Sequence, residues 1–296
     1  MSTMLVKSLA VRSTVLSLLL LIWSASASAS SPQGISIKVF TSPDDQFSVN
    51  SVIAEGDHEV MLVDAQLTKA GAERVLEEID ATKKPLSLIY ITHEHADHFL
   101  GLEVFKDAYP GVRIIASSAV VSRINKVYQE KIDKWQAILG PGATSHVVAI
   151  SKFDGSAFEF EGARIEVIRD IQGDTDQNTM LWIPGQRILI AGDVLFSGMH
   201  VYTAETDGSA RAKWLDTIRK VRQLKPSIAI PGHGRAGAPL DANTAVDFTE
   251  SYLLAFEEEL GKAHDPDSFV STMKERFPSA DFPLALERGA KANVKP

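Results

Sequence analysis

The chain has 296 residues, of which 45% are hydrophobic and 23% charged, with a formal net charge of −8 at pH 7 and no cysteine. A chain without cysteine has neither a disulfide framework nor a lipobox thiol. The acidic balance argues against a nucleic-acid-binding protein, because phosphates are held by clusters of lysine and arginine. The densest basic stretch, residues 211–225, has the spacing of a solvated helix face.

The first 29 residues have the pattern of a secretory signal peptide. Two basic residues precede the apolar stretch Val15–Trp23, and an alternating Ser-Ala run follows it. The apolar stretch is about nine residues long, well short of the roughly 20 that span a bilayer. We therefore expect cleavage after Ala27 or Ala29 and a periplasmic or secreted protein without stable membrane association. The mature domain, residues 30–296, has a net charge of −10, because the leader carries two basic residues and no acidic one.

Strands and one helix are expected at the start of the mature domain. Runs rich in β-branched residues predict strands over residues 35–40, 48–54 and 60–63, with a hairpin turn at residues 55–57. Residues 69–83 place apolar side chains three and four apart, which predicts a helix with one stripe packed on a sheet. This order is typical of the β-rich start of a layered α/β fold.

The most informative motif follows the apolar run Leu86–Ile91 and reads His93-Glu94-His95-Ala96-Asp97-His98. Residues two apart on an extended backbone project to the same side, so His93 and His95 can hold one cation while Asp97 and His98 turn towards a second. Neutral imidazole and carboxylate are ligands for zinc and its neighbours. The zincin pattern His-Glu-x-x-His is excluded, because position 97 is aspartate.

A helix at residues 99–109 and a strand at residues 112–116 come next. Residues 117–139 then predict a long helix or helix pair that carries Tyr128 and Trp135. These aromatic residues either belong to a flap over the site or pack the helix on the body of the protein. Their near-heptad spacing favours packing.

The second half is expected to contain strands followed by helices. Strand runs lie at residues 147–150, 158–161, 163–168, 180–183, 187–192 and 227–232, and helical runs at residues 241–261 and 266–277. Asp193 and His233 directly follow the last two of these strands. Because ligands of open α/β sheets gather at the carboxyl ends of strands, we expect Asp193 and His233 to meet the histidine-rich loop in one crevice.

Two further residues, His200 and Tyr202, lie in the segment after Asp193. A substrate contact and simple loop packing are equally good interpretations for both. Trp214 is expected to be buried beneath this segment. The pattern Ser271-x-x-Lys274 matches serine β-lactamases, but their other motifs do not occur, and a helix explains it.

The sequence resembles the metallo-β-lactamase superfamily of αββα hydrolases. The resemblance rests on the histidine-rich motif followed by Gly101, on Ala191-Gly192-Asp193, and on Pro231-Gly232-His233-Gly234, and it covers about residues 35–233. It implies a four-layer αββα sandwich, with C-terminal helices over about residues 241–296. It also implies the ligand sets: His93 and His95 for the first metal, Asp97, His98 and His233 for the second, and Asp193 as the bridge between them.

One position departs from the family pattern. Where the family has histidine in a Gly-His-Thr turn, this chain reads Gly173-Asp174-Thr175. A carboxylate can ligate zinc, so we expect Asp174 to complete the first site, giving two zinc ions per chain. A single metal, or iron or manganese in place of zinc, is the alternative. Asp176 is a substitute ligand that fits a turn role better.

The resemblance implies hydrolysis of an acyl ester, lactone, thioester or β-lactam, a small-molecule substrate, by a metal-bound hydroxide. Metal ions lower the pKa of bound water from about 15.7 to around 7, and Asp97 can orient this nucleophile and receive its proton. The lack of cysteine excludes the β-lactamases that use a cysteine ligand, and Asp193 is closer to the arrangement of thioesterases and lactonases. β-Lactam hydrolysis is therefore the second choice.

Two other classes of function stay open. In an iron-dependent oxidoreductase, His93, His95 and Asp174 would form a set of two histidines and one carboxylate. In a non-catalytic metal- or ligand-binding protein, the change at Asp174 would have removed turnover.

Overall fold

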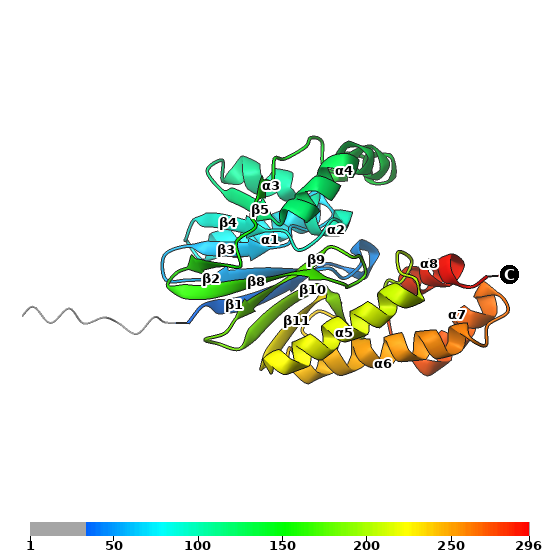
Figure 1. Ribbon diagram of the computed structural model, residues 1–296. Coiled ribbons are helices and arrows are strands. Elements are labelled where there is room, and N and C mark those ends of the chain that lie inside the picture. The colour runs from blue at the N-terminus through cyan, green and yellow to red at the C-terminus, as the bar shows by residue number, and fades with distance from the viewer. Residues whose placement is uncertain (1–33, 296) are drawn as a thin grey trace, which may run out of the picture. The chain divides into compact units, whose positions relative to one another are not determined.

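The computed structural model describes residues 34–295. The expected signal peptide lies outside this range. In the described part, two sheets face each other and helices cover the outer face of each (Figure 1). The predicted αββα sandwich is confirmed.

The first sheet has the strand order β1-β2-β3-β4-β5-β6. Its strands are β1 (Ser36–Thr41), β2 (Asn50–Glu55), β3 (Val60–Val63), β4 (Leu86–Tyr90), β5 (Arg113–Ala116) and β6 (Ser151–Lys152). The pairs β1–β2 and β2–β3 are antiparallel, whereas β3, β4, β5 and β6 run parallel. The parallel strands therefore send their carboxyl ends to one edge of the sheet.

The second sheet has the order β11-β10-β9-β8-β7. Its strands are β7 (Ala157–Phe160), β8 (Ala163–Ile171), β9 (Asn178–Ile183), β10 (Ile188–Ser197) and β11 (Ile228–Gly234). Only β10 and β11 are parallel; the other pairs are antiparallel hairpin neighbours.

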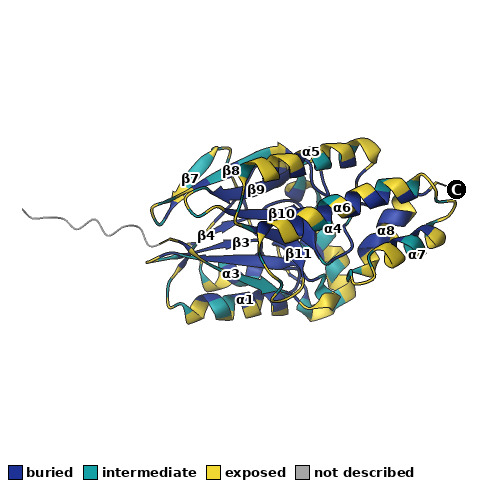
Figure 2. Ribbon diagram, turned by 90° about the horizontal axis from the view of Figure 1, so that it is seen from below, coloured by how far each residue is buried: buried dark blue, intermediate teal, exposed yellow. Residues whose placement is uncertain are grey.

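Successive side chains of each strand pack into different layers of the sandwich. In the first sheet, Ile53, Leu62 and Ile89 pack towards the helices, while their neighbours Val52 and Met61 face the second sheet. Successive strand residues point to opposite faces, so a sheet covered on both sides needs apolar residues in nearly every position. Figure 2 shows these strands buried in the centre and the helices exposed on their outer faces.

Two groups of helices form the outer layers. The first sheet is covered by α1 (Lys69–Ala81), α3 (Leu102–Ala108) and α4 (Ser118–Leu139), and the second by α5 (Gly208–Leu224) and α6 (Ala242–Leu260), followed by α7 (Pro266–Arg276) and α8 (Pro283–Asn293). No helix among residues 34–295 is both long and apolar enough to cross a bilayer.

The structure departs from the predicted elements in three places. The predicted strand at residues 147–150 is irregular; pairing with β5 begins only at Ser151, although Val148 and Ile150 do bury their side chains under α4. The predicted helix at residues 99–109 is divided into α2 (Ala96–Phe99) and α3. Gly101 lies between them, where a Cβ atom would stand 2.0 Å from the carbonyl oxygen of Ala65.

The third departure concerns the strands that carry Asp193 and His233. The sequence places both residues just past a strand, but β10 and β11 continue through them. The register of β10 against β11 shifts on either side of Gly192, whose φ is +50°. Such a bulge lets a strand continue while it re-aims a side chain, here that of Asp193.

Candidate metal centre

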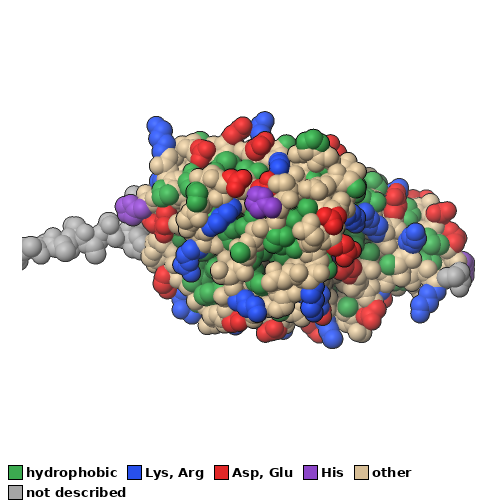
Figure 3. Space-filling model, turned by 90° about the horizontal axis from the view of Figure 1, so that it is seen from above, with side chains coloured by type: hydrophobic (Ala, Val, Ile, Leu, Met, Phe, Trp, Pro, Cys, Tyr) green, Lys and Arg blue, Asp and Glu red, His purple; other side chains and the backbone are tan. Residues whose placement is uncertain are grey.

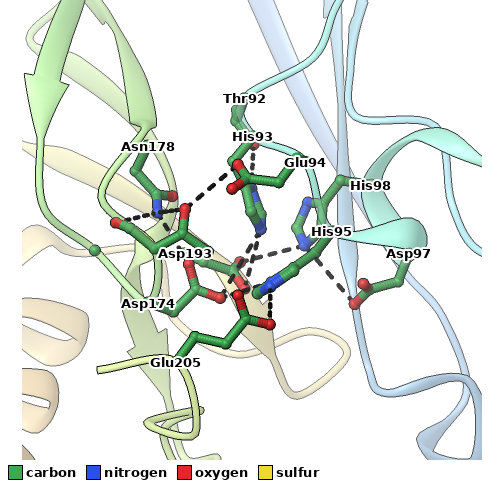
Figure 4. A network of polar contacts seen from close by, with 12 residues as sticks. Thr92, His93, Glu94, His95, Asp97, His98, Asp174, Asn178, Asp193 and Glu205 are labelled. Carbon is green, nitrogen blue, oxygen red and sulfur yellow. Dashed lines mark hydrogen bonds and ion pairs between the residues drawn. The ribbon is translucent and has the colours of Figure 1, made fainter. Parts of the chain in front are cut away.

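The seven predicted ligands come together at the edge where the two sheets meet. They form two groups whose potential ligand atoms lie within 4.8 Å of one another: His93, His95, Asp174 and Asp193 in one, and Asp97, His98 and His233 in the other. The histidine-rich loop and the short helix α2 follow β4 of the first sheet. Asp174 and Asp193, on the other side of the cluster, belong to the half of the chain that forms the second sheet (Figure 4).

The first group combines two imidazoles and two carboxylates. His95 Nδ1 lies 2.8 Å from Asp174 Oδ2, and His93 Nε2 lies 3.9 Å from the same oxygen. His93 Nε2 is also 3.6 Å from Asp193 Oδ2. His95 has extended backbone angles, φ −72° and ψ 142°, as the predicted pairing of His93 and His95 requires.

The second group meets the first at Asp193. His98 Nε2 lies 3.3 Å from Asp193 Oδ1, and His233 Nε2 lies 3.2 Å from Asp193 Oδ2. Asp97 Oδ2 is 3.4 Å from His233 Nε2. Asp193 therefore lies within 3.6 Å of three imidazoles and within 4.8 Å of the fourth, that of His95, which is the position of a bridging carboxylate.

The atoms that face one another in this cluster lack hydrogen-bond partners although they are buried. They are His93 Nε2, His98 Nε2, Asp174 Oδ2 and Asp193 Oδ1. Buried polar atoms without partners are rare, since each costs about 1–3 kcal/mol. These nitrogen and carboxylate oxygen atoms direct their lone pairs to one place, where no hydrogen-bond donor meets them. Such an arrangement fits divalent cations, so the residues present suit a metal centre.

The other ring nitrogens of His93 and His98 are held by hydrogen bonds. His98 Nδ1 is 2.8 Å from Asp64 Oδ2, and His93 Nδ1 is 3.0 Å from Thr92 Oγ1. The Thr92 hydroxyl donates to Asp64 Oδ2 at 2.7 Å, and the Thr92 amide donates to Asp64 Oδ1 at 2.8 Å. With Nδ1 protonated on both rings, Nε2 offers its lone pair to the centre, which is how outer carboxylates orient histidine ligands.

His95 and His233 are oriented in the same way by different partners. His233 Nδ1 lies 2.7 Å from the carbonyl oxygen of Phe47, to which it can only donate. His95 Nε2 lies 3.1 Å from Glu205 Oε1, which leaves His95 Nδ1 facing Asp174. Each of the four rings thus has one nitrogen anchored and one directed into the cluster.

Asp64, Thr92 and Glu205 are the participants that the sequence interpretation missed. Asp64 directly follows the predicted strand at residues 60–63, the same signal that identified Asp193, so it could have been found. It has φ +61°, an uncommon conformation for a residue other than glycine, held by its bonds to Thr92 and His98. Nothing in the sequence around Glu205 distinguishes it.

Asp174 lies in the loop between β8 and β9, which is held by a hydrogen bond from Asn178 and by an ion pair with α4. Its Oδ1 accepts a hydrogen bond of 2.9 Å from Asn178 Nδ2. Two residues further on, Asp176 is exposed and forms an ion pair with Arg123 of α4, which also holds the buried Glu94 at 2.8 Å. The structure therefore brings Asp174, and not Asp176, into the cluster.

Two glycines are required by the close approach of the strands that carry the ligands. A Cβ atom on Gly232 would lie 1.8 Å from Asp193 Oδ1, and one on Gly192 would lie 2.9 Å from Thr92 Oγ1. Glycine is the residue that permits such an approach.

The two carboxylates of the first group differ in pKa. Burial raises the pKa of Asp174 to about 7, with a further increase from the neighbouring Asp193, although His95 and Asn178 favour the charged form. Burial has the same tendency at Asp193, but the imidazoles of His233, His98 and His93 outweigh it and hold the pKa of Asp193 well below its usual range. Asp193 is thus the permanent negative charge of the cluster.

A cavity of about 130 Å³ opens onto the cluster. His95, Asp97, Asp193 and His233 line it, together with Ala96, Tyr202, Glu205 and side chains of α4 and α8. The ring of Tyr202 stands edge-on to His95 at 5.4 Å between centroids. The structure thus brings Tyr202, one of the two predicted contact residues, to the cavity.

His200, the other predicted contact residue, does not line this cavity. Its ring is buried and lies 3.1 Å from the hydroxyl of Tyr252, and its backbone N–H donates to the carbonyl of Asp281. The loop-packing interpretation is the one that describes His200. Trp214 is fully buried, as predicted, and its indole N–H donates to the carbonyl of Val194 at 2.8 Å.

Comparisons with known proteins give one family. The model of the metallo-beta-lactamase superfamily matches residues 44–233. The type 2 metallo-beta-lactamase of Bacillus cereus is 22% identical over 191 residues, which are 64% of this chain and 68% of that protein. The hydroxyacylglutathione hydrolase of Prochlorococcus marinus (strain MIT 9301) is 27% identical over 143 residues, 48% of either chain.

Solved structures of this family share the fold. A metallo-beta-lactamase family protein from Thermus thermophilus superposes with a TM-score of 0.61 at 20% sequence identity. The superposition covers 87% of this chain and 93% of that protein.

Proposed function

The chain belongs to the metallo-β-lactamase superfamily, and on that premise we propose that it is a zinc-dependent hydrolase of an acyl ester, lactone or thioester. The observation that carries the proposal is the convergence of seven histidine and aspartate side chains, four of which direct buried atoms without hydrogen-bond partners into the cluster. β-Lactam hydrolysis is the second candidate, because one relative of the chain is named a metallo-beta-lactamase. Another relative, named a hydroxyacylglutathione hydrolase, fits the first choice.

Two metal ions would be held by the two groups of residues and joined by Asp193. The first would be held by His93, His95 and Asp174, and the second by Asp97, His98 and His233. When bound, such ions supply Lewis acidity and make water nucleophilic at neutral pH.

The side chains of the cavity would position water and substrate for the reaction. Asp97 lies on the cavity wall beside His233 and has a carboxylate that can accept a proton from the attacking water. The water oxygen bonds to the acyl carbon, the bond to the leaving oxygen, sulfur or nitrogen breaks, and that atom takes up a proton. Phe47, Trp135 and Phe282 would keep bulk water away from this exchange.

The proposal is tested by assaying a panel of one ester, one lactone, one thioester and one β-lactam against the wild type and two variants. His98→Ala and His233→Ala should each abolish hydrolysis and lower bound metal, because each removes an imidazole from the second group. Lys274→Ala is the control: Lys274 is on α7, outside the cavity, and its loss should leave turnover unchanged.

The same experiment separates the alternatives. About two zinc ions per purified chain with turnover supports the hydrolase. Iron together with oxygen consumption supports an oxidoreductase, and metal without turnover on any member of the panel supports a binding protein.

An exported location is part of the proposal. It is supported by the leader pattern of residues 1–29 in the sequence. Mass spectrometry of the exported protein should find a terminus near Ser28 or Ser30, and an intact Met1 terminus in the membrane fraction would contradict it.

A small-molecule substrate, and no nucleic acid, also belongs to the proposal. It is supported by the net charge of −8 and by the surface, on which lysine and arginine are interspersed with aspartate and glutamate on the face seen in Figure 3. A polyanion would need a continuous basic surface.

A further inference from the structure

Three cationic side chains line the cavity that opens onto the metal cluster. Lys131 and Lys134 come from α4 and Arg288 from α8, two helices on opposite sides of the sandwich. Among the residues that the structure describes, none of these three has a carboxylate oxygen within 4.0 Å of its charged nitrogens. Their charge is therefore available to a ligand in a protein whose overall charge is negative.

The acidic side chains of the cavity are engaged elsewhere. Glu205 is bonded to His95, and Asp97 and Asp193 belong to the metal cluster. The bond to His95 is the main reason that the pKa of Glu205 is lowered, with Lys131 and Arg123 adding a smaller electrostatic effect. The cavity thus has a metal-binding end whose acids are already partnered and a cationic rim without carboxylate partners. In this rim Lys134 Nζ lies over the ring of Trp135 at 5.9 Å, and Arg288 lies beside Tyr202.

Three aromatic side chains form an apolar wall between α4 and α8. Phe47 contacts Trp135 at 5.8 Å and Phe282 at 5.3 Å between ring centroids, and Phe282 stacks on His233 at 5.4 Å. The wall therefore reaches from the helix with the two lysines to a residue of the metal cluster.

Two residues of this wall have an uncommon backbone conformation. Phe47 has φ +72° and Phe282 has φ +65°, a region that bulky residues rarely adopt. Such conformations persist where the surrounding structure imposes them. Both residues line the same cavity.

We propose that this cavity selects substrates that carry a carboxylate on an apolar body, with the carboxylate held by Lys131, Lys134 and Arg288 and the body by Phe47, Trp135 and Phe282. The proposal rests on the proposed hydrolase function and names its substrate class. Charge-assisted hydrogen bonds from lysine and arginine are the usual means of carboxylate recognition, and an apolar wall beside them excludes water and strengthens them. The scissile bond would lie at the His–Asp end of the cavity.

The test compares two esters that differ in one charge, mono-4-nitrophenyl glutarate and 4-nitrophenyl valerate. For the wild type, kcat/KM should be at least roughly tenfold higher for the glutarate ester. The triple variant Lys131→Gln/Lys134→Gln/Arg288→Gln should lose this advantage through a KM for the glutarate ester that is roughly tenfold higher, which corresponds to about 1.4 kcal/mol. Its kcat/KM for the valerate ester should change much less than its kcat/KM for the glutarate ester.

A matched control is available on the same two helices. Lys126 of α4 and Lys291 of α8 are exposed and do not line the cavity. Lys126→Gln/Lys291→Gln should keep the preference for the anionic ester, which separates contact with the substrate from a general effect of net charge.

A binding measurement distinguishes failure of this proposal from failure of the hydrolase function. Trp135 lies in the cavity wall, whereas Trp182 and Trp214 are buried elsewhere. In the wild type, 4-phenylbutyrate should bind and change the tryptophan fluorescence, whereas 4-phenylbutyramide should not. In Trp135→Phe, 4-phenylbutyrate should leave the tryptophan fluorescence unchanged. Anion binding without hydrolysis would overturn only the hydrolase function; equal hydrolysis of both esters, or equal binding of both probes, would overturn the carboxylate proposal.

Discussion

Asp174 is the residue that distinguishes this cluster from the histidine pattern that the sequence resembles. Its side chain is fully buried, faces His95 at 2.8 Å through one oxygen and is fixed by Asn178 through the other. A carboxylate in this position gives the first group two negative charges, from Asp174 and Asp193, in place of one. This extra charge favours harder cations and makes water at the site less acidic than three imidazoles would.

Removing the Asp174 carboxylate should cost one metal ion. Asp174→Ala should bind about one zinc equivalent fewer than the wild type in a metal titration, because His93 and His95 alone leave only two terminal donors. Asp174→His should restore the second equivalent. Asp176→Ala is the control from the same loop, where the side chain is exposed and paired with Arg123, and it should bind like the wild type. Wild-type stoichiometry and affinity in Asp174→Ala would show that Asp174 is only a turn residue.

Residue chemistry made the cluster predictable, but not its supports. His93, His95, Asp97 and His98 could be found because ligand types are concentrated in six residues after an apolar strand. Two of the partners that orient the imidazoles are ordinary residues from distant segments: Phe47 contributes only a carbonyl oxygen to His233, and Glu205 lies in an irregular segment. Such roles depend on the tertiary structure and leave no local pattern.

At the level of elements, α4 combines two roles that the sequence treated as alternatives. Tyr128 is buried and packs edge-on against Phe99 at 4.8 Å, so this part of the helix belongs to the core. Two turns later, Trp135 is only half-buried and lines the cavity beside the metal cluster. The near-heptad spacing of the aromatic residues identified the face of the helix that packs on the core. It could not indicate that the end of the helix continues beyond the core and lines the cavity.

The strand β11 can carry His233 into the cluster only if the residue before it has no side chain. Gly232→Ala should abolish zinc binding or prevent folding, since its Cβ atom would stand 1.8 Å from Asp193 Oδ1. Gly234→Ala is the matched control, because the nearest atom to its Cβ would be Asn50 Nδ2 at 3.4 Å. Zinc titration of both variants decides between them, and normal binding by Gly232→Ala would refute the close packing of β10 and β11.

Glu103 of α3 connects this helix to the segment that leads into β6. Burial tends to raise the pKa of Glu103, but the ion pair with Lys69 and hydrogen bonds from Ser145 and His146 lower it from 4.5 to about 2. A carboxyl with a lower pKa in the folded state stabilises the protein above its unfolded pKa, and the stabilisation is lost as the pH falls through the folded pKa. The difference corresponds to about 3 kcal/mol at neutral pH.

Glu103→Gln should therefore lower the free energy of unfolding by about 2–3 kcal/mol at pH 7. The difference between variant and wild type should shrink between about pH 4.5 and 2, where the wild-type carboxyl takes up its proton. Urea unfolding of both proteins at several pH values measures this. A difference that is independent of pH would mean that Glu103 acts through packing alone.

At the scale of the whole molecule, the metal cluster is built from residues of both halves of the sandwich. The first sheet supplies His93, His95, Asp97 and His98, and the second supplies Asp174, Asp193 and His233. The layered α/β class was predictable from the apolar runs of alternating strands and helices, and the αββα arrangement followed from the resemblance to the family. Which residues line the cavity was not, since α4 and α8 are distant in the sequence and the boundaries of α8 were not predicted.

The central claim is that this cluster is a two-metal hydrolytic centre, and one titration tests it most directly. Metal-free protein is titrated with zinc while hydrolysis of mono-4-nitrophenyl glutarate is followed in the same sample. We expect no hydrolysis without metal, a rise in rate with occupancy, and a maximum at about two equivalents, as two groups of converging ligands require. Full activity before zinc is added, or saturation with zinc without any hydrolysis of this ester or of the other panel substrates, would contradict the claim.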